Sequence, residues 1–133
     1  MKKVMCSGGF DPLHVGHLNH LREASKLGTV AVALTSDDWL MRKKGYVFMS
    51  WKDRAFILAG LSCVASVHPV VDEDDTVCAA LRTIRPDIHA NGGDRVEPLP
   101  AEDAVCKELG IRQVFGIGGD KTHSSSKLVE AVR

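Results

Sequence analysis

The segment at residues 7–17, Ser-Gly-Gly-Phe-Asp-Pro-Leu-His-Val-Gly-His, constrains the fold more than any other part of the chain. A short apolar run at residues 2–6 precedes it, and Leu18, Leu21 and Ala24 follow it at helical spacing. The segment is therefore predicted to be the turn between a buried strand and a helix. In an open parallel sheet such a turn lies at the carboxyl end of a strand, where these folds bind ligands, and the helix start offers free amides to an anion.

The residue types in this turn suit a phosphate group. Gly8, Gly9 and Gly16 permit backbone conformations and close approaches that a Cβ would block. His14 and His17 lie three residues apart at the predicted helix start, so both imidazoles can turn toward one point. A glycine-rich turn or a lone histidine is often only structural, but paired imidazole donors beside helix amides suit the charge that develops on a phosphoryl group.

The rest of the chain alternates between strand-like and helix-like segments. Apolar runs of strand length occupy residues 29–35, 64–70, 87–91 and 111–117. Helical patterns or helix signals lie between and after them, near residues 36–44, 50–61, 76–85, 101–109 and 124–132. This alternation predicts an α/β fold with a parallel sheet and helices on both faces, in one domain at residues 1–133.

Composition narrows the class of protein. The chain has 17 Lys and Arg against 17 Asp and Glu among 133 residues, and this zero net charge argues against a broad nucleic-acid surface. No apolar run is long enough to cross a membrane, and residues 1–3 lead straight into a strand without a cleavage site. A cytoplasmic protein that binds neither membrane nor nucleic acid is expected.

The cysteines and histidines do not indicate a metal site. The cysteines are far apart and form no C-x-x-C pair, which is typical of reduced core thiols in a cytoplasmic protein. They are Cys6, Cys63, Cys78 and Cys106. His20 lies one helical turn beyond His14 and His17, so the three histidines do not form an obvious zinc site, and no metal ligands are predicted.

Charged residues after the second predicted strand are further candidates. Asp37 follows Ser36, and it either caps the next helix or faces the ligand crevice; the two interpretations are compatible. Lys44 ends a basic run and precedes the loop at residues 46–49, which could fold over a polyphosphate. Arg54 falls in the first turn of the next helix, where a cation opposes the helix dipole. A phosphate partner for Arg54 is predicted, with a solvated surface arginine as the alternative.

The second half of the chain contains three more polar segments. The acidic run at residues 72–75 lacks the pattern of a calcium loop and is interpreted as the solvated start of the helix at 76–85. Gly92, Gly93 and Asp94 end a predicted strand where a flat nucleobase can lie on the backbone. The serines at residues 124–126 either cap the last helix or form a second anion site, which Lys121 favours.

The segment G-G-F-D-P-L-H-V-G-H at residues 8–17 resembles the signature of the cytidylyltransferase-like nucleotidyltransferases. Its H-x-G-H motif also occurs in class I aminoacyl-tRNA synthetases. The resemblance extends over nearly the whole chain and is greatest to the adenylyltransferase domain of bacterial ADP-heptose synthases, and next to glycerol-3-phosphate cytidylyltransferases. It implies a Rossmann-like domain with a five-stranded parallel sheet in the order 3-2-1-4-5, and a homodimer.

The resemblance also implies roles for residues that match the family's motifs. The implied catalytic residues are His14, His17 and Lys44. The implied nucleotide- and phosphate-binding residues are Gly8, Gly9, Phe10, Asp11, Arg54, Gly92, Gly93, Asp94, Ser124, Ser125 and Ser126. Asp37, Trp39 and Lys44 are assigned to the acceptor. At residues 124–126 serines replace both threonines of the family's S-T-T motif, which retains a hydroxyl at each position.

The implied reaction is transfer of a nucleoside monophosphate from ATP or CTP, with Mg²⁺ on the triphosphate, to a sugar phosphate or polyol phosphate, releasing pyrophosphate. Residues 119–122 do not match the R-T-E-G of the cytidylyltransferase branch. This favours an acceptor such as D-glycero-β-D-manno-heptose 1-phosphate and leaves the base open. A glycerol-3-phosphate cytidylyltransferase and a non-catalytic nucleotide-binding module are alternatives, and the short length disfavours a synthetase fragment.

Overall fold

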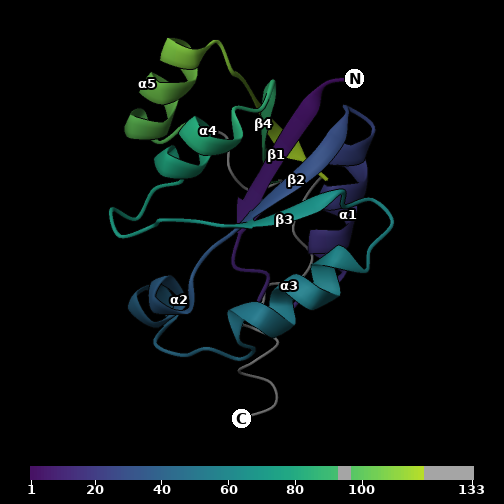
Figure 1. Cartoon of the computed structure of the whole chain (residues 1–133), viewed down its shortest axis with the longest axis vertical. Helices are drawn as coiled ribbons and strands as arrows, with labels where there is room; N and C mark the ends of the chain where they lie inside the picture. The colour runs from purple at the N-terminus through teal and green to yellow at the C-terminus, as the bar shows by residue number, and fades with distance from the viewer. Residues whose placement is uncertain (93–96, 119–133) are drawn as a thin grey trace.

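The computed structural model describes residues 1–92 and 97–118, and its centre is a five-stranded sheet (Figure 1). All the strand pairs are parallel, and the strand order is β3-β2-β1-β4-β5. The strands are β1 (Lys3–Gly8), β2 (Thr29–Leu34), β3 (Ser66–Pro69), β4 (Ile88–Gly92) and β5 (Arg112–Ile117). This confirms the predicted α/β class and the order 3-2-1-4-5.

Helices cover both faces of the sheet, as predicted (Figure 1). They are α1 (Val15–Ser25), α2 (Asp37–Lys44), α3 (Trp51–Ala59), α4 (Cys78–Ile84) and α5 (Pro100–Leu109). Helices α1 and α3 pack on one face, α4 and α5 pack on the other, and α2 lies beyond the carboxyl end of the strands. The helix predicted near the carboxyl terminus lies outside the described residues.

The alternation of side chains along the strands divides the core into two layers. Val4 and Cys6 of β1 point to the face covered by α1 and α3, where they meet Leu21 and Leu58. Met5 points to the opposite face, where it packs with residues of α4 and α5. Because both faces of the sheet are covered by helices, the inner strand β2 is apolar almost throughout and reads Thr-Val-Ala-Val-Ala-Leu.

The sheet register brings the ends of β1 and β2 to the same level. The pairing runs from Lys3 opposite Thr29 to Gly8 opposite Leu34. The segment that follows β1 therefore begins beside the segment that follows β2. Strand β1 also pairs with β4, so the order of the strands reverses at β1. In open α/β sheets, the crevice outside the carboxyl ends of the strands at such a reversal is where ligands bind.

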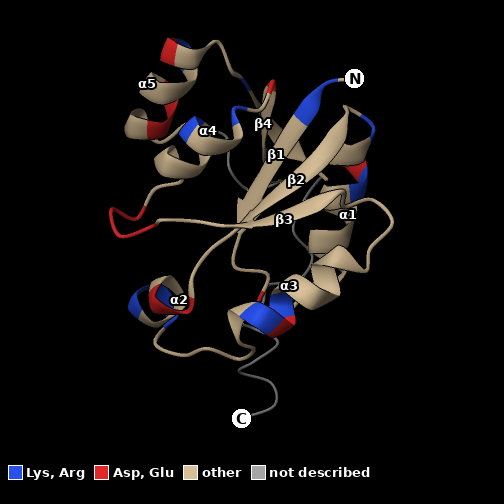
Figure 2. Ribbon diagram, in the orientation of Figure 1, with Lys and Arg blue, Asp and Glu red and all other residues tan. Residues whose placement is uncertain are grey.

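The acidic run at residues 72–75 corrects one expectation. Helix α4 begins at Cys78, and the run forms a loop that leads to it (Figure 2). Asp72 is only 4% exposed, and its carboxylate accepts hydrogen bonds from both the backbone N–H and the hydroxyl of Ser36, each at 2.7 Å. The prediction of a solvated carboxylate was wrong for Asp72, because this residue supports the start of α2.

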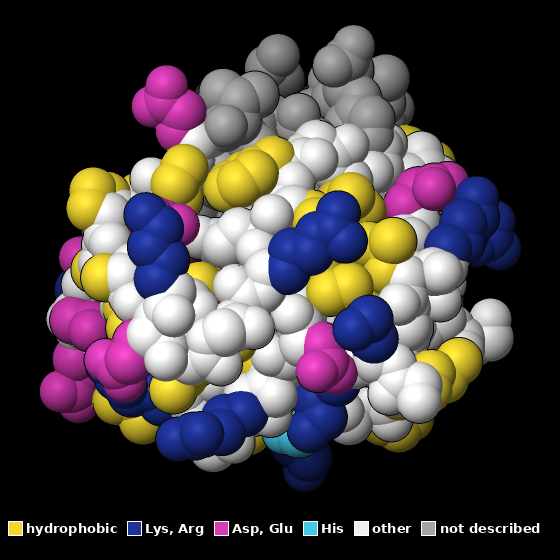
Figure 3. Space-filling model, turned by 90° about the horizontal axis from the view of Figure 1, so that it is seen from above, with side chains coloured by type: hydrophobic (Ala, Val, Ile, Leu, Met, Phe, Trp, Pro, Cys, Tyr) yellow, Lys and Arg dark blue, Asp and Glu magenta, His cyan; other side chains and the backbone are white. Residues whose placement is uncertain are grey.

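The surface charges, the helix lengths and the cysteines do not point to a particular ligand. On the face seen in Figure 3, Lys and Arg side chains are interspersed with Asp and Glu. None of the helices in the described ranges is long and apolar enough to cross a membrane. The four cysteines are free thiols, and burial raises the pKa of Cys6 to about 12.

Candidate nucleotide site at the start of the first helix

The two histidines of the H-x-G-H segment form the first turn of α1. Nδ1 of His14, the N-cap residue, accepts the N–H of Gly16 at 3.0 Å. Nδ1 of His17 accepts the N–H of His14 at 3.2 Å, which completes a capping box made of two imidazoles. Because each Nδ1 accepts an N–H, the neutral rings carry their protons on Nε2. The cap therefore selects the tautomer in which Nε2 is the donor atom.

The two rings also lie against each other. The centroids of His14 and His17 are 3.8 Å apart and the ring planes differ by 23°. Phe10 contacts the His17 ring edge-on, with the centroids 4.9 Å apart. The histidines thus lie together at the carboxyl end of β1, partly buried, beside the first amides of α1.

Gly16 is required by the position of the His14 ring. A Cβ added to Gly16 would lie 2.9 Å from Cε1 of His14, closer than such atoms approach one another. The glycine between the histidines therefore gives the capping imidazole the space to fold over the helix start. Gly9 shows a similar close approach, because a Cβ there would lie 2.9 Å from Leu40 and 3.7 Å from Trp39.

Asp11, which was predicted to orient either the turn or the nucleotide, is bonded to the backbone of the protein itself. Its side chain is fully buried, and its two oxygens accept the N–H groups of Phe48 and Met49, each at 2.7 Å. The carboxylate therefore holds the backbone between α2 and α3 against the turn that follows β1. Both of its oxygens are engaged by the protein.

Arg54 was predicted to bind a phosphate, with a solvated surface arginine as the alternative, and the alternative was wrong because the side chain is buried. It is 1% exposed, and all three nitrogens of its guanidinium donate to protein acceptors. Nη1 donates to the carbonyls of Gly9 and Thr35, each at 2.9 Å, Nε to that of Met49 at 3.0 Å, and Nη2 to Oδ1 of Asp37 at 2.6 Å. A buried guanidinium needs such acceptors, because an unpaired charge there would be costly.

The predicted acceptor residues lie at or near the start and end of α2. Asp37 begins the helix and is paired with Arg54, with its side chain 44% exposed. Trp39 is half-buried beside Gly9, which places an indole next to the histidine turn. Lys44 ends the helix and forms no ion pair with the described residues, whereas its neighbours Arg42 and Lys43 pair with Asp75 at 3.1 and 3.5 Å.

A polar cluster between β4 and β5 was not predicted from the sequence. The side-chain oxygen of Gln113 accepts from Nδ1 of His89 at 2.7 Å and from the side-chain amide of Asn91 at 3.0 Å. These residues read as ordinary positions in two apolar strands, and only the pairing of the strands brings them together. The cluster joins β4 to β5 next to Gly92, the last residue of β4.

The other predicted nucleotide contacts fall partly outside the described residues. Gly92 lies at the carboxyl end of β4, two strand positions from the buried Ala90. The predicted positions Gly93 and Asp94, and the serines at residues 124–126, lie outside the described ranges. The base-binding and second phosphate-binding roles therefore stay predictions.

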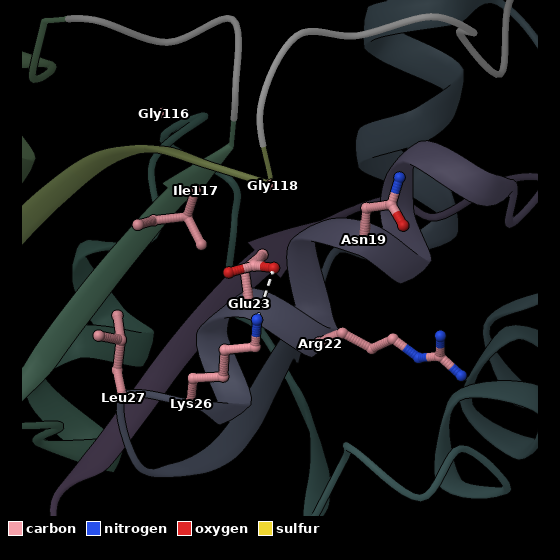
Figure 4. A pocket seen from close by; sticks show the side chains of 8 residues that line it. All are labelled: Asn19, Arg22, Glu23, Lys26, Leu27, Gly116, Ile117 and Gly118. Carbon is pink, nitrogen blue, oxygen red and sulfur yellow. Dashed lines mark hydrogen bonds and ion pairs between the residues drawn. The ribbon is translucent and has the colours of Figure 1, made fainter.

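The described residues offer no metal site, and the hollow beside α1 includes no predicted site residue. Within residues 1–92 and 97–118, no group of three or more His, Cys, Asp or Glu side chains is arranged to hold a metal ion. A hollow between α1 and the end of β5 is lined by residues that include Arg22, Lys26 and Ile117 (Figure 4). It contains none of the predicted site residues.

The chain is similar to a known protein family and to proteins of known name. A family model described as cytidylyltransferase-like matches residues 5–130. The chain is 38% identical to a protein named bifunctional protein HldE from Helicobacter pylori strain G27, over 99% of this chain and 28% of that protein. It is 45% identical to the bifunctional protein HldE of Syntrophotalea carbinolica, over 80% of this chain and 21% of that protein. The chain thus spans less than a third of these relatives.

A solved structure has the same fold. It is described as the lipopolysaccharide core biosynthesis protein from Thermoplasma volcanium GSS1, and it matches with a TM-score of 0.72 at 26% identity. The match covers 86% of this chain and 93% of that chain. The similarity therefore includes nearly all of both chains.

Proposed function

The chain belongs to the cytidylyltransferase-like family of nucleotidyltransferases, and on this premise we propose that it transfers the adenylyl group of ATP to a sugar 1-phosphate. The proposed acceptor is D-glycero-β-D-manno-heptose 1-phosphate or a close analogue. The observation that supports the proposal best is the pair of stacked imidazoles at the start of α1, beside the carboxyl end of β1.

The proposed reaction is a displacement at the α-phosphorus of the nucleotide. An oxygen of the acceptor phosphate forms a bond to the α-phosphorus, the bond from that phosphorus to the bridging oxygen breaks, and pyrophosphate leaves with the electron pair. A phosphate monoester is already ionised near neutral pH, so no strong general base is needed. Catalysis then consists of alignment and of stabilising the charge that develops on the phosphate oxygens.

The first turn of α1 suits this chemistry. The Nε2–H groups of His14 and His17 are the proposed donors to the triphosphate, with His17 next to the α-phosphate. The amides at the helix start add the field of the helix dipole. Lys44, which forms no ion pair with the described residues, is the proposed cation for the acceptor phosphate or the α-phosphate.

Mg²⁺ is proposed to enter with the triphosphate. The described carboxylates fit a supporting role only, because both oxygens of Asp11 accept backbone amides and Asp37 is paired with Arg54. The ion would neutralise charge on the phosphates. The phosphate oxygens are the proposed main ligands of the ion, and Asp37, at the start of α2, is the proposed protein ligand.

The heptose branch is proposed because several observations agree. The relatives named bifunctional protein HldE match nearly the whole chain, and the structural neighbour is described as a lipopolysaccharide core biosynthesis protein. Trp39, beside Gly9, and Asp37, paired with Arg54, offer an aromatic surface and a carboxylate, which are groups that bind sugar carbons and hydroxyls. Neither group selects the sugar by itself.

An acceptor screen tests the proposed reaction. Wild-type protein is incubated with ATP or CTP and with heptose 1-phosphate, glycerol 3-phosphate or no acceptor, and pyrophosphate release is measured. The proposal predicts release that requires both ATP and the heptose phosphate. Release with CTP and glycerol 3-phosphate would instead support the alternative cytidylyltransferase, and binding of nucleotide without release from any pair would support a non-catalytic module.

We also propose a cytoplasmic homodimer. Phe56 and Ile57 are 82% and 39% exposed on α3, an apolar surface that a second copy could cover. Light scattering at micromolar concentration would give twice the monomer mass of 14.4 kDa if the dimer forms. A monomer mass, or dimerisation unchanged by Phe56→Ser, would contradict this assignment of the surface.

A further inference from the structure

The segment Tyr46–Met49, between α2 and α3, is held in place by two buried charged residues. Phe48 is 52% exposed, so its side chain does little to fix the segment. The backbone of the segment is bound, because Asp11 accepts the N–H groups of Phe48 and Met49 and Arg54 donates to the carbonyl of Met49. Hydrogen bonds to buried charged groups are among the stronger ones in proteins.

The same two residues connect this segment to the nucleotide-binding turn. Asp11 lies three residues before His14, in the turn that follows β1. Arg54 also donates to the carbonyls of Gly9 in that turn and of Thr35 after β2, and to Asp37 at the start of α2. One guanidinium thus holds together three segments, at residues 9, 35–37 and 49.

Lys44 lies between two fixed points as a result. It ends α2, whose start is tied to Arg54 through Asp37, and only Gly45 separates it from the segment that Asp11 holds. Arg42 and Lys43 are drawn toward Asp75, on the acidic loop. The position of the Lys44 ammonium relative to the histidines therefore depends on bonds that Asp11 and Arg54 make.

We propose that Asp11 and Arg54 are positioning residues, which do not touch the substrate but hold Lys44 and the Tyr46–Met49 segment against the histidine turn. This inference rests on the proposed function only for the role of Lys44. The claim that Asp11 and Arg54 fix the segment rests on hydrogen bonds within the chain, and it can be tested without substrate.

The chain contains a single tyrosine, Tyr46, which provides a direct probe. Protein grown with 3-fluorotyrosine gives one ¹⁹F resonance that reports on the segment. Trypsin cleavage at the basic run 42–44 gives a second measure of opening, and kcat/KM with ATP and heptose 1-phosphate gives the functional one. The variants are Asp11→Asn and Arg54→Lys, with Asp53→Asn, an exposed carboxylate next to Arg54, as the matched control.

Each substitution removes hydrogen bonds to the segment, while Asp11→Asn keeps the size of the side chain and Arg54→Lys keeps its charge. Asparagine at residue 11 places the N–H donor of its side-chain amide against one of the two backbone N–H groups, so that hydrogen bond is lost. Lysine at residue 54 keeps the positive charge but cannot reach acceptors in four directions. Circular dichroism confirms folding of each variant, and Arg54→Lys gives an independent test should the fully buried Asp11 not tolerate replacement.

The expected result is a shifted or broadened ¹⁹F resonance and at least about tenfold faster cleavage in both variants, the effect of losing one hydrogen bond to a charged group. The loss in kcat/KM should be at least about tenfold as well. Asp53→Asn should match wild type in all three measurements.

A resonance and a cleavage rate close to those of wild type in folded variants would overturn the proposal. A loss of kcat/KM without any change in the segment would also overturn it, since that would indicate direct contact with substrate. If the wild-type protein releases no pyrophosphate, the proposed function fails, while the two loop measurements still test the positioning of the segment.

Discussion

At the scale of single residues, the spacing of the H-x-G-H segment follows from two hydrogen bonds within the first turn of α1. His14 and His17 cap the helix through Nδ1, and this leaves Nε2 as the atom that donates. The same two side chains therefore stabilise the helix start and present donors where an anion would bind. The sequence predicted that the histidines act together, but it did not indicate that His14 is the cap.

Gly16→Ala separates the structural and functional roles of this turn. The new methyl group would lie 2.9 Å from the His14 ring, so the ring must move. Displacing the ring weakens its cap hydrogen bond, whereas alanine is a better helix former, so we expect the free energy of unfolding to change by no more than about 1 kcal/mol. We expect kcat/KM to fall by about tenfold to a hundredfold, because the donor is displaced. Urea unfolding and steady-state kinetics check both parts, and unaltered kinetics would show that the ring position does not matter.

At the scale of elements, sequence patterns located the strands and helices but not the contacts that fix their ends. The apolar runs and helical patterns identified the elements to within a few residues. The partners of Arg54 and Asp72 could not be predicted, because they lie up to 45 residues away and meet only when β1 and β2 are paired. A buried charge in an amphipathic helix looks the same in sequence as an exposed one.

Asp72→Ala tests the link between the acidic loop and α2. The substitution leaves the backbone N–H and the hydroxyl of Ser36 without their acceptor. We expect the free energy of unfolding to fall by about 2 kcal/mol. Glu73→Ala, at the exposed neighbouring position, is the matched control and should change it by less than about 0.5 kcal/mol. Equal effects in urea unfolding would show that Asp72 has no special role.

At the scale of the whole molecule, the sheet brings functional groups together from distant parts of the chain. The order of strands places the turn after β1 beside the segment after β2, and this was predictable from the family resemblance. Which side chains enter the crevice was only partly predictable, since Asp11 and Arg54 are used by the protein itself. The sequence patterns and the family resemblance therefore predicted the order of the strands, but not which charged residues are bonded to the protein itself.

The stability of the whole fold should depend on pH through His20, which joins α1 to the end of β5. Its Nδ1 donates to the carbonyl of Ile117 at 2.9 Å, and burial lowers the pKa of this imidazole below its ordinary value of 6.5. The unfolded chain therefore takes up a proton near pH 6.5 that the folded chain does not. Stability is full above that pH and falls as the pH drops below it.

His20→Gln should reduce this dependence, because the amide can still donate to Ile117 but does not titrate. We expect the pH slope of the unfolding free energy between pH 6.5 and 5.5 to be smaller in the variant, by at most about 1.4 kcal/mol per pH unit. Urea unfolding at several pH values measures it. A slope as steep as that of wild type would mean that other groups cause the loss of stability in acid.

The paired imidazoles at the start of α1 are proposed to stabilise the reacting triphosphate, and the turnover of His17→Ala is the decisive measurement. The variant lacks the donor assigned to the α-phosphate, so we expect kcat with ATP and heptose 1-phosphate to fall by at least about a hundredfold. Its circular dichroism spectrum should remain that of the folded protein. A folded His17→Ala variant that turns over at a rate near that of wild type would contradict the claim.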